Sequence, residues 1–113
     1  MRALRTEVAA TLIDIEAQLR QLNLWDREPP APEALASREP FAFDTLTLPQ
    51  WLQFIFLPTL YTLLEEQRPL PEACAITPMA EEYFRGSGLA TGTLLEALDQ
   101  IDALLSGDIA EPG

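Results

Sequence analysis

Apolar residues recur at helical spacing along the amino-terminal part of the chain. They fall three or four positions apart, and charged or amide side chains occupy many of the positions between them. This period predicts an amphipathic helix from about Ala3 to Leu22 and disfavours a strand, whose period is two. The apolar seam consists of Leu4, Val8, Leu12, Ile15, Leu19 and Leu22. Packing inside a helical bundle is the favoured interpretation of this seam, and the edge of a coiled-coil dimer is the alternative.

A second helix, apolar around nearly its whole circumference, is predicted from Thr47 to about Gln67. Thr47 and Gln50 have the T-x-x-Q spacing of a capping box, and Pro49 fits the first turn, where a missing N–H does no harm. An all-round apolar helix is typical of one surrounded by others. Pro58 lies inside this helix, removes one ladder hydrogen bond, and is therefore expected to bend it.

The apolar side chains of this second helix divide into two groups on a helical wheel. The inward arc holds Leu52, Ile55, Phe56 and Leu63, and off it lie Trp51, Phe54 and Tyr61. If the other helices leave part of the circumference uncovered, the Trp51 side must meet the chain's own proline-rich segment or another chain. The chain's own segment is the favoured cover, and an interaction surface is the alternative. Gln50 and Gln53 are assigned to an exposed turn, as candidates for polar contacts.

Two more helices are predicted in the carboxyl-terminal half. The first has Thr77 as its N-cap and ends at Gly86. The second runs from about Leu94 to Leu105, with Thr93 and Glu96 as another capping box. Its apolar positions repeat the helical period of the first helix.

Prolines interrupt the helical pattern from Asn23 to Phe43. They fix φ and remove backbone donors, so this stretch is predicted to connect the first two helices. Together these elements predict an all-α fold, namely a four-helix, bundle-like domain with a long proline-rich loop between helices 1 and 2. The length of 113 residues fits one helical domain spanning residues 1–113.

The chain is strongly acidic, with 18 Asp and Glu against 7 Arg and a net charge of −11. Such a surface repels phosphate backbones and anionic lipid heads, so we expect neither direct nucleic-acid binding nor membrane binding. A basic protein partner would fit, although solubility alone is the favoured explanation of the charge. No apolar stretch approaches the roughly 20 residues of a membrane span, and no signal peptide is recognisable, so a cytoplasmic location is expected.

The residue inventory excludes many enzyme mechanisms. The chain has no histidine, which removes Ser-His-Asp and Cys-His pairs and the histidine-containing metal motifs of helical bundles. It also has no lysine, which removes the Walker A phosphate loop and Schiff-base chemistry. We therefore expect a protein that is not an enzyme, with no catalytic residue, no cofactor and no metal site.

Three weaker signals have plainer structural explanations. The glycine-rich stretch 85–92 resembles a phosphate-binding loop, but it follows a helix and lacks lysine, so an interhelix turn is favoured. Glu96, Asp99 and Asp102 form an acidic stripe that could bind a divalent metal, but without a nitrogen ligand a solvated face is favoured. Cys74 has no base to activate it and is interpreted as a small buried apolar residue.

A series of motifs spans nearly the whole chain: a tryptophan before paired prolines, then S-x-x-PF-x-x-DT, WLQF-x-x-LP, LP and P-x-x-E. Their residues are Trp25, Pro29, Pro30, Ser37, Pro40, Phe41, Asp44, Thr45, Trp51, Leu52, Gln53, Phe54, Pro58, Leu70, Pro71, Pro78 and Glu81. The series resembles the YqcC-like family of small bacterial proteins. The resemblance implies an all-helical bundle and supplies no function, although some members are encoded beside a tRNA pseudouridine synthase. Thr59 departs from the pattern, because a basic residue is common there in relatives, and a shared site using that residue would be altered here.

Three functions are compatible with these features. The leading hypothesis is a small acidic interaction or accessory protein, a homodimer or bound to another protein through the aromatic surface of the second helix. One alternative is a binding module for a small apolar or amphipathic ligand near the Pro58 kink. The other is a non-catalytic accessory to a tRNA-modifying pseudouridine synthase. The candidate interaction surface comprises Trp25, Phe41, Asp44, Gln50, Trp51, Gln53, Phe54 and Tyr61.

Overall fold

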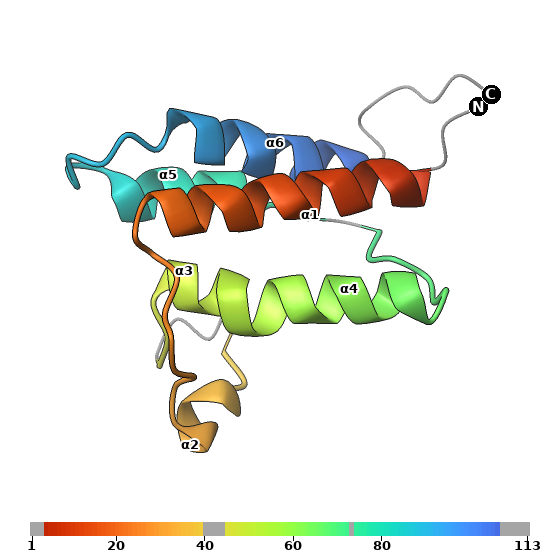
Figure 1. Cartoon of the computed structure of the whole chain (residues 1–113), viewed down its shortest axis with the longest axis horizontal. Helices are drawn as coiled ribbons and strands as arrows, with labels where there is room; N and C mark the ends of the chain where they lie inside the picture. Colours follow the sequence, from red (N-terminus) through yellow and green to blue (C-terminus); the bar gives the residue numbers. More distant parts are fainter. Residues whose placement is uncertain (1–3, 40–44, 73, 107–113) are drawn as a thin grey trace.

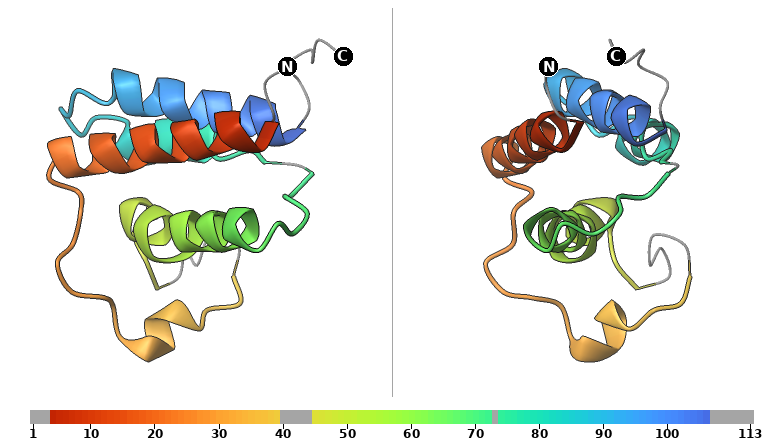
Figure 2. Two further views of the ribbon diagram at one scale, coloured as in Figure 1. Left: turned by 45° about the vertical axis from the view of Figure 1, so that its right-hand side comes forward. Right: turned by 90° about the vertical axis from the view of Figure 1, so that its right-hand side faces the viewer.

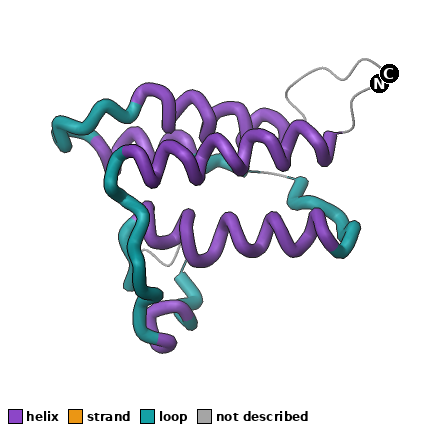
Figure 3. Tube along the Cα trace, in the orientation of Figure 1, coloured by secondary structure: helices purple, strands orange, loops and turns teal. Residues whose placement is uncertain are grey.

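The computed structural model describes residues 4–39, 45–72 and 74–106, and every regular element in these ranges is helical (Figure 3). The all-α prediction is therefore confirmed. The elements are α1 (Leu4–Gln21), α2 (Pro32–Leu35), α3 (Leu48–Trp51), the π-helical turn η2 (Leu52–Phe56), α4 (Leu57–Glu65), α5 (Thr77–Phe84) and α6 (Gly92–Ser106). No helix in the described ranges combines the length and the hydrophobicity that crossing a membrane requires.

The helices α1, α5 and α6 lie side by side, and the continuous helix α3–η2–α4 runs along them (Figure 1). The most extensive helix pair is α1 with α6, while α5 packs on α6 and α4 packs on α1. Seen end-on, α1, α5, α6 and α4 surround a common centre, and α2 lies outside it, beyond α4 (Figure 2).

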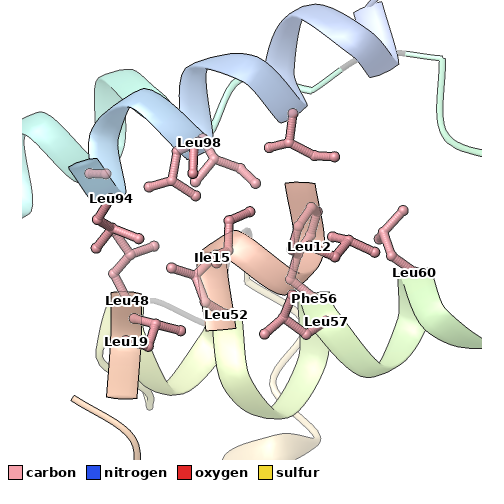
Figure 4. Close-up of a cluster of buried hydrophobic side chains, with 14 of the residues drawn as sticks. Leu12, Ile15, Leu19, Leu48, Leu52, Phe56, Leu57, Leu60, Leu94 and Leu98 are labelled. Atoms are coloured by element: carbon pink, nitrogen blue, oxygen red, sulfur yellow. The ribbon is translucent and has the colours of Figure 1, made fainter. Parts of the chain in front are cut away.

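Apolar side chains, mostly leucine and isoleucine, from α1, α5, α6 and the α3–η2–α4 helix fill the centre. The seam predicted for α1 is buried, with Leu12, Ile15 and Leu19 at 0% exposure, and it meets the seam of α6. Figure 4 shows these side chains pointing toward those of the α3–η2–α4 helix. Full burial of such a side chain contributes about 1.5–3 kcal/mol relative to exposure, so the spacing of the apolar residues decides which helix faces turn inward.

Pro58 is accommodated by the π-helical turn that precedes it. The N–H of Leu57 donates to the carbonyl oxygen of Leu52, five residues back, so the turn holds one residue more than an α-helical turn. After this turn Leu57 is buried, whereas Ile55 and Leu63 are only half-buried. The inward arc expected from a regular helix is therefore wrong for Ile55 and Leu63, because the extra residue rotates the helix surface that follows it.

Only one of the three predicted N-caps is confirmed. At Thr47, the hydroxyl accepts from the N–H of Gln50 at 3.2 Å, and the Gln50 side chain accepts from the Thr47 N–H at 2.9 Å. By contrast, Thr77 is the first residue of α5 and not its cap, and α6 begins at Gly92, which places Thr93 inside the first turn. Both predictions placed the helix start too late, because a threonine in a first turn has the same sequence signature as a cap.

Arg5 fastens α1 to the end of α4. Its Nη2 atom donates to the carbonyl oxygen of Leu63 at 2.7 Å. Carbonyl groups in the last turn of a helix lack intrahelical partners and carry partial negative charge, so a guanidinium is a favourable partner there.

Candidate docking groove

Gln53 was expected on an exposed turn, but the structure buries it to 7% exposure. Its Oε1 accepts from the backbone N–H of Asp26 at 2.8 Å, and its Nε2 donates to the carbonyl oxygen of Asp26, also at 2.8 Å. One amide thus satisfies both backbone groups of a residue in the connection after α1. Gln53 therefore holds that connection against η2 and is unavailable to a partner.

Gln50 serves the fold as well. Besides its place in the capping box, its Nε2 donates to Oδ2 of Asp26 at 3.2 Å. The two predicted contact glutamines therefore share one target, Asp26. Both link the α1–α3 connection to the start of the α3–η2–α4 helix.

Trp25 lies apart from the groove described below. It is half-buried against the core, and the guanidinium of Arg20 lies 4.3 Å from its ring centroid. Arg20 also forms an ion pair with Glu16 at 3.1 Å. A cation over one face of an indole is stabilising, so the contact with Arg20 holds the Trp25 ring against α1.

The other predicted surface residues are dispersed. Trp51 is half-buried and stacks on Phe56, with ring centroids 5.3 Å apart and planes at 28°. Tyr61 is half-buried against the core, and burial, with a smaller contribution from the charge of Glu16, raises the pKa of its phenol. Phe54 is also half-buried and is not among the residues that line the groove described below. The remaining two candidates, Phe41 and Asp44, lie outside the described residues.

An apolar groove with a volume of about 310 Å³ lies beside the π-helical turn. One wall is the face of η2 and α4, and the other is the connection between α4 and α5 together with the end of α6. The lining residues are Trp51, Ile55, Phe56, Thr59, Leu60, Pro71, Cys74, Ala75, Ile76 and Leu105. Of the six predicted interaction-surface residues that the structure describes, Trp51 alone is among them. The volume is at the lower end of the range for ligand sites, roughly 300–1,000 Å³.

Asp102 on α6 fixes the second wall of the groove. Its carboxylate accepts from the backbone N–H groups of Ile76 and Thr77, at 2.9 and 2.8 Å, and from the Thr77 hydroxyl at 2.7 Å. One turn further along α6, the hydroxyl of Ser106 is bonded to both backbone groups of Cys74, at 3.1 Å each. The Asp102 contacts supply, from another helix, partners for the backbone N–H groups just before and at the start of α5.

The same contacts change the interpretation of the acidic stripe. Glu96 and Asp99 are exposed, as expected for a solvated face, whereas Asp102 is half-buried and bonded to the α4–α5 connection. The prediction of a solvated face is therefore wrong for Asp102. Within the described ranges, no three His, Cys, Asp or Glu side chains gather so as to hold a metal ion.

Cys74 contributes its thiol to the groove wall. Burial first, and then the hydrogen bond and charge of Asp102, raise the pKa of Cys74 to about 12. The thiolate is the reactive form of cysteine, so at neutral pH this side chain behaves as an apolar lining residue. The groove can therefore seat apolar groups, and the Cys74 thiol in its wall is not poised as a nucleophile.

Most of the groove could not be found from the sequence. Ile55 was assigned to the core because the π-helical turn was not foreseen. Pro71 belongs to a family motif and Ile76 to none, and neither signals a site. Trp51 had been predicted as part of an interaction surface, and Thr59 had been noted as a departure from a family pattern; Thr59 lies on the exposed rim.

Helices around an apolar centre and an open apolar groove define a small all-α protein with a candidate binding surface. Residues 7–104 match the family model DUF446, described as tRNA pseudouridine synthase C. A Haemophilus influenzae protein named as uncharacterized is 42% identical over 82 residues, which cover 73% of this chain and 77% of that protein. Protein YqcC of Escherichia coli, also named as uncharacterized, is 33% identical over 94 residues, covering 83% and 86%. The chain therefore belongs to the family that the DUF446 model describes.

Two further comparisons concern structure and domain context. The solution NMR structure of YqcC from E. coli superposes with a TM-score of 0.81 at 29% identity, covering 99% of this chain and 96% of that one. The protein named tRNA pseudouridine synthase C from Pectobacterium carotovorum is 42% identical over 80 residues, which cover 71% of this chain but only 21% of that protein. The matching region is therefore a minor part of the longer protein.

Proposed function

We propose that this chain is a small, four-helix, bundle-like accessory protein that binds a tRNA pseudouridine synthase and takes no catalytic part itself. The observation that carries the proposal is the 42% identity to one fifth of the Pectobacterium protein named tRNA pseudouridine synthase C. In that protein, a region like this chain and a much larger remainder share one polypeptide. Where the two are separate polypeptides, the same contact would form between them.

The chemistry of the chain supports a binding role. It has no histidine or lysine, and its one cysteine has a pKa raised to about 12. Its net charge of −11 opposes direct contact with tRNA phosphates, which leaves RNA binding to the enzyme. Such a role places the chain in the cytoplasm, where tRNA is modified.

Complex formation tests this proposal. The full chain is titrated into the tRNA pseudouridine synthase of the same organism, and binding is followed by isothermal titration calorimetry and by size-exclusion chromatography with light scattering. We expect a stable complex, and tRNA alone should not bind this chain at physiological salt. The absence of a complex at about 100 μM of both proteins contradicts the proposal. Light scattering of the chain alone also measures whether it forms the homodimer that was predicted from its aromatic residues.

A second candidate function is a binding module for a small apolar or amphipathic ligand, favoured by the groove of about 310 Å³ beside Pro58. A fluorescent apolar probe, titrated into the folded chain, tests it. Saturable binding with one site per chain supports this function, and fluorescence that rises only when the chain unfolds contradicts it.

A further inference from the structure

The apolar groove extends along the helix that forms one of its walls. Trp51, Ile55 and Thr59 line it at spacings of four residues, which correspond to roughly 12 Å of helix. At Pro71 and Leu105 it adjoins a second hollow of about 430 Å³ that both residues also line. Together they form a surface that fits a short segment of polypeptide better than a compact ligand.

The second hollow adds charge at its rim. Glu72 lines it and is exposed, and it forms no ion pair within the described part of the chain. Arg5 also lines this hollow, but its guanidinium is bonded to the carbonyl oxygen of Leu63. An incoming cation therefore finds a carboxylate that is not already paired.

The charge of the whole chain favours the same kind of partner. A net charge of −11 without any lysine produces a negative potential over much of the surface. An enzyme that acts on tRNA must present basic residues to phosphates. Complementary charge of this kind steers two proteins together and fixes their relative orientation.

We infer that this groove binds a segment of the synthase in which a large apolar side chain is flanked by Lys or Arg. The apolar side chain would seat between Ile55 and Pro71, which both keep exposed surface in the groove, and a flanking cation would lie near Glu72. This inference rests on the proposed function and adds to it the docking surface and the chemistry of the docked segment. An apolar anchor in a desolvated pocket with charges at the rim is the arrangement in which few residues carry most of the binding energy.

Ile55 offers a clean test because it is half-exposed and belongs neither to the buried core nor to the residues packed against it. The variant Ile55→Glu should keep the circular dichroism spectrum and weaken synthase binding by about 30-fold or more, as for a hot-spot residue. The matched control is Ile13→Glu, at an isoleucine that is 60% exposed on α1 and does not line the groove. That control should change the Kd by less than about twofold.

Charge reversal tests the rim. Glu72→Lys should weaken binding by about threefold to tenfold at low salt, and the loss should shrink as salt rises, as for a rim charge. Glu81→Lys, with the same charge change at an exposed position on α5, is the control for net charge alone. Equal losses in the two variants contradict a specific cation near Glu72.

The outcomes separate this inference from the proposed function. If the wild-type chain does not bind the synthase, the proposed function fails regardless of the groove. If it binds and Ile55→Glu binds equally well, the function stands and the groove inference is overturned. If Ile55→Glu only dissociates a homodimer, or only abolishes binding of an apolar probe, the occupant is a second copy or a small ligand, and the inference is again overturned.

Discussion

At the scale of single residues, polar side chains that look available for binding are used to hold the fold. Gln53 pairs with both backbone groups of Asp26, and Asp102 binds the backbone before and at the start of α5. Neither role follows from the sequence, because each depends on a partner 25 or more residues away. A helical wheel or a motif describes only residues close in sequence. Both methods therefore placed the side chains of Gln53 and Asp102 in solvent.

Gln53→Met should lower the free energy of unfolding by about 1–2 kcal/mol, because two backbone groups of Asp26 lose their partner while the side-chain volume is kept. Urea denaturation followed by tryptophan fluorescence measures the loss. The control is Gln100→Met on the exposed face of α6, which should change stability by less than about 0.5 kcal/mol. Equal effects in the two variants would show that the Gln53 amide contributes nothing particular.

Cys74 should be unreactive in the folded protein. The pKa of its thiol rises from 9.0 to about 12, so at pH 8 its thiolate fraction falls on the order of a thousandfold relative to an unfolded chain. Alkylation by iodoacetamide, timed by mass spectrometry in buffer and in 8 M urea, gives the ratio of rates. A folded rate within tenfold of the unfolded rate would contradict the assignment.

The sign of the pH effect follows from the same raised pKa. The folded state favours the protonated thiol, so its contribution to stability is complete below the unfolded pKa of about 9 and is lost as pH rises toward about 12. Comparison of wild type with Cys74→Ser should reveal a stability difference that narrows over this window.

At the scale of elements, the helices could be predicted and their rotation could not. The seams of α1 and α6, and the capping box of α3, follow from local spacing and were found in advance. The π-helical turn was not, because proline in a helix can be accommodated by a bend, a break or a wider turn. That turn decides which side chains of α4 face the core and leaves Ile55 at the groove.

Pro58→Ala tests whether the π-helical turn relieves the strain of the proline. We expect the free energy of unfolding to change by less than about 1 kcal/mol, because the turn already avoids the clash with the preceding carbonyl. Thr62→Pro, one turn later in the regular helix α4, should cost about 3 kcal/mol or more. A gain of about 3 kcal/mol from Pro58→Ala would show that the proline is strained in the native helix.

Asp102→Ala should destabilise the connection between α4 and α5. Two backbone N–H groups and one hydroxyl lose a charged acceptor, so we expect a loss of about 2–3 kcal/mol in unfolding free energy. Asp99→Ala, at an exposed position on the same helix, should cost less than about 0.5 kcal/mol. Chemical denaturation measures both, and a loss below 0.5 kcal/mol for Asp102→Ala would rule out this role.

At the scale of the whole molecule, side-chain packing shapes the core and the groove, while composition sets the acidity. The apolar side chains of α1, α5, α6 and the α3–η2–α4 helix form the core, and the apolar surface left uncovered beside η2 is the groove. Among the described residues of the predicted aromatic surface, Trp51 reaches the groove, while Trp25 and Tyr61 pack elsewhere. The acidity follows from composition alone, but the position of the groove depends on three chain segments that meet only in the folded protein.

We propose above that the synthase docks in the groove beside the π-helical turn. Backbone amide chemical-shift mapping of the isotope-labelled chain, with unlabelled synthase added stepwise, tests it most directly. We expect the largest changes at Ile55, Thr59 and residues 74–76, and none in α1 around Ile13. Changes that centre on the outer face of α1 or on the turn between α5 and α6, with the groove amides unmoved, would contradict it.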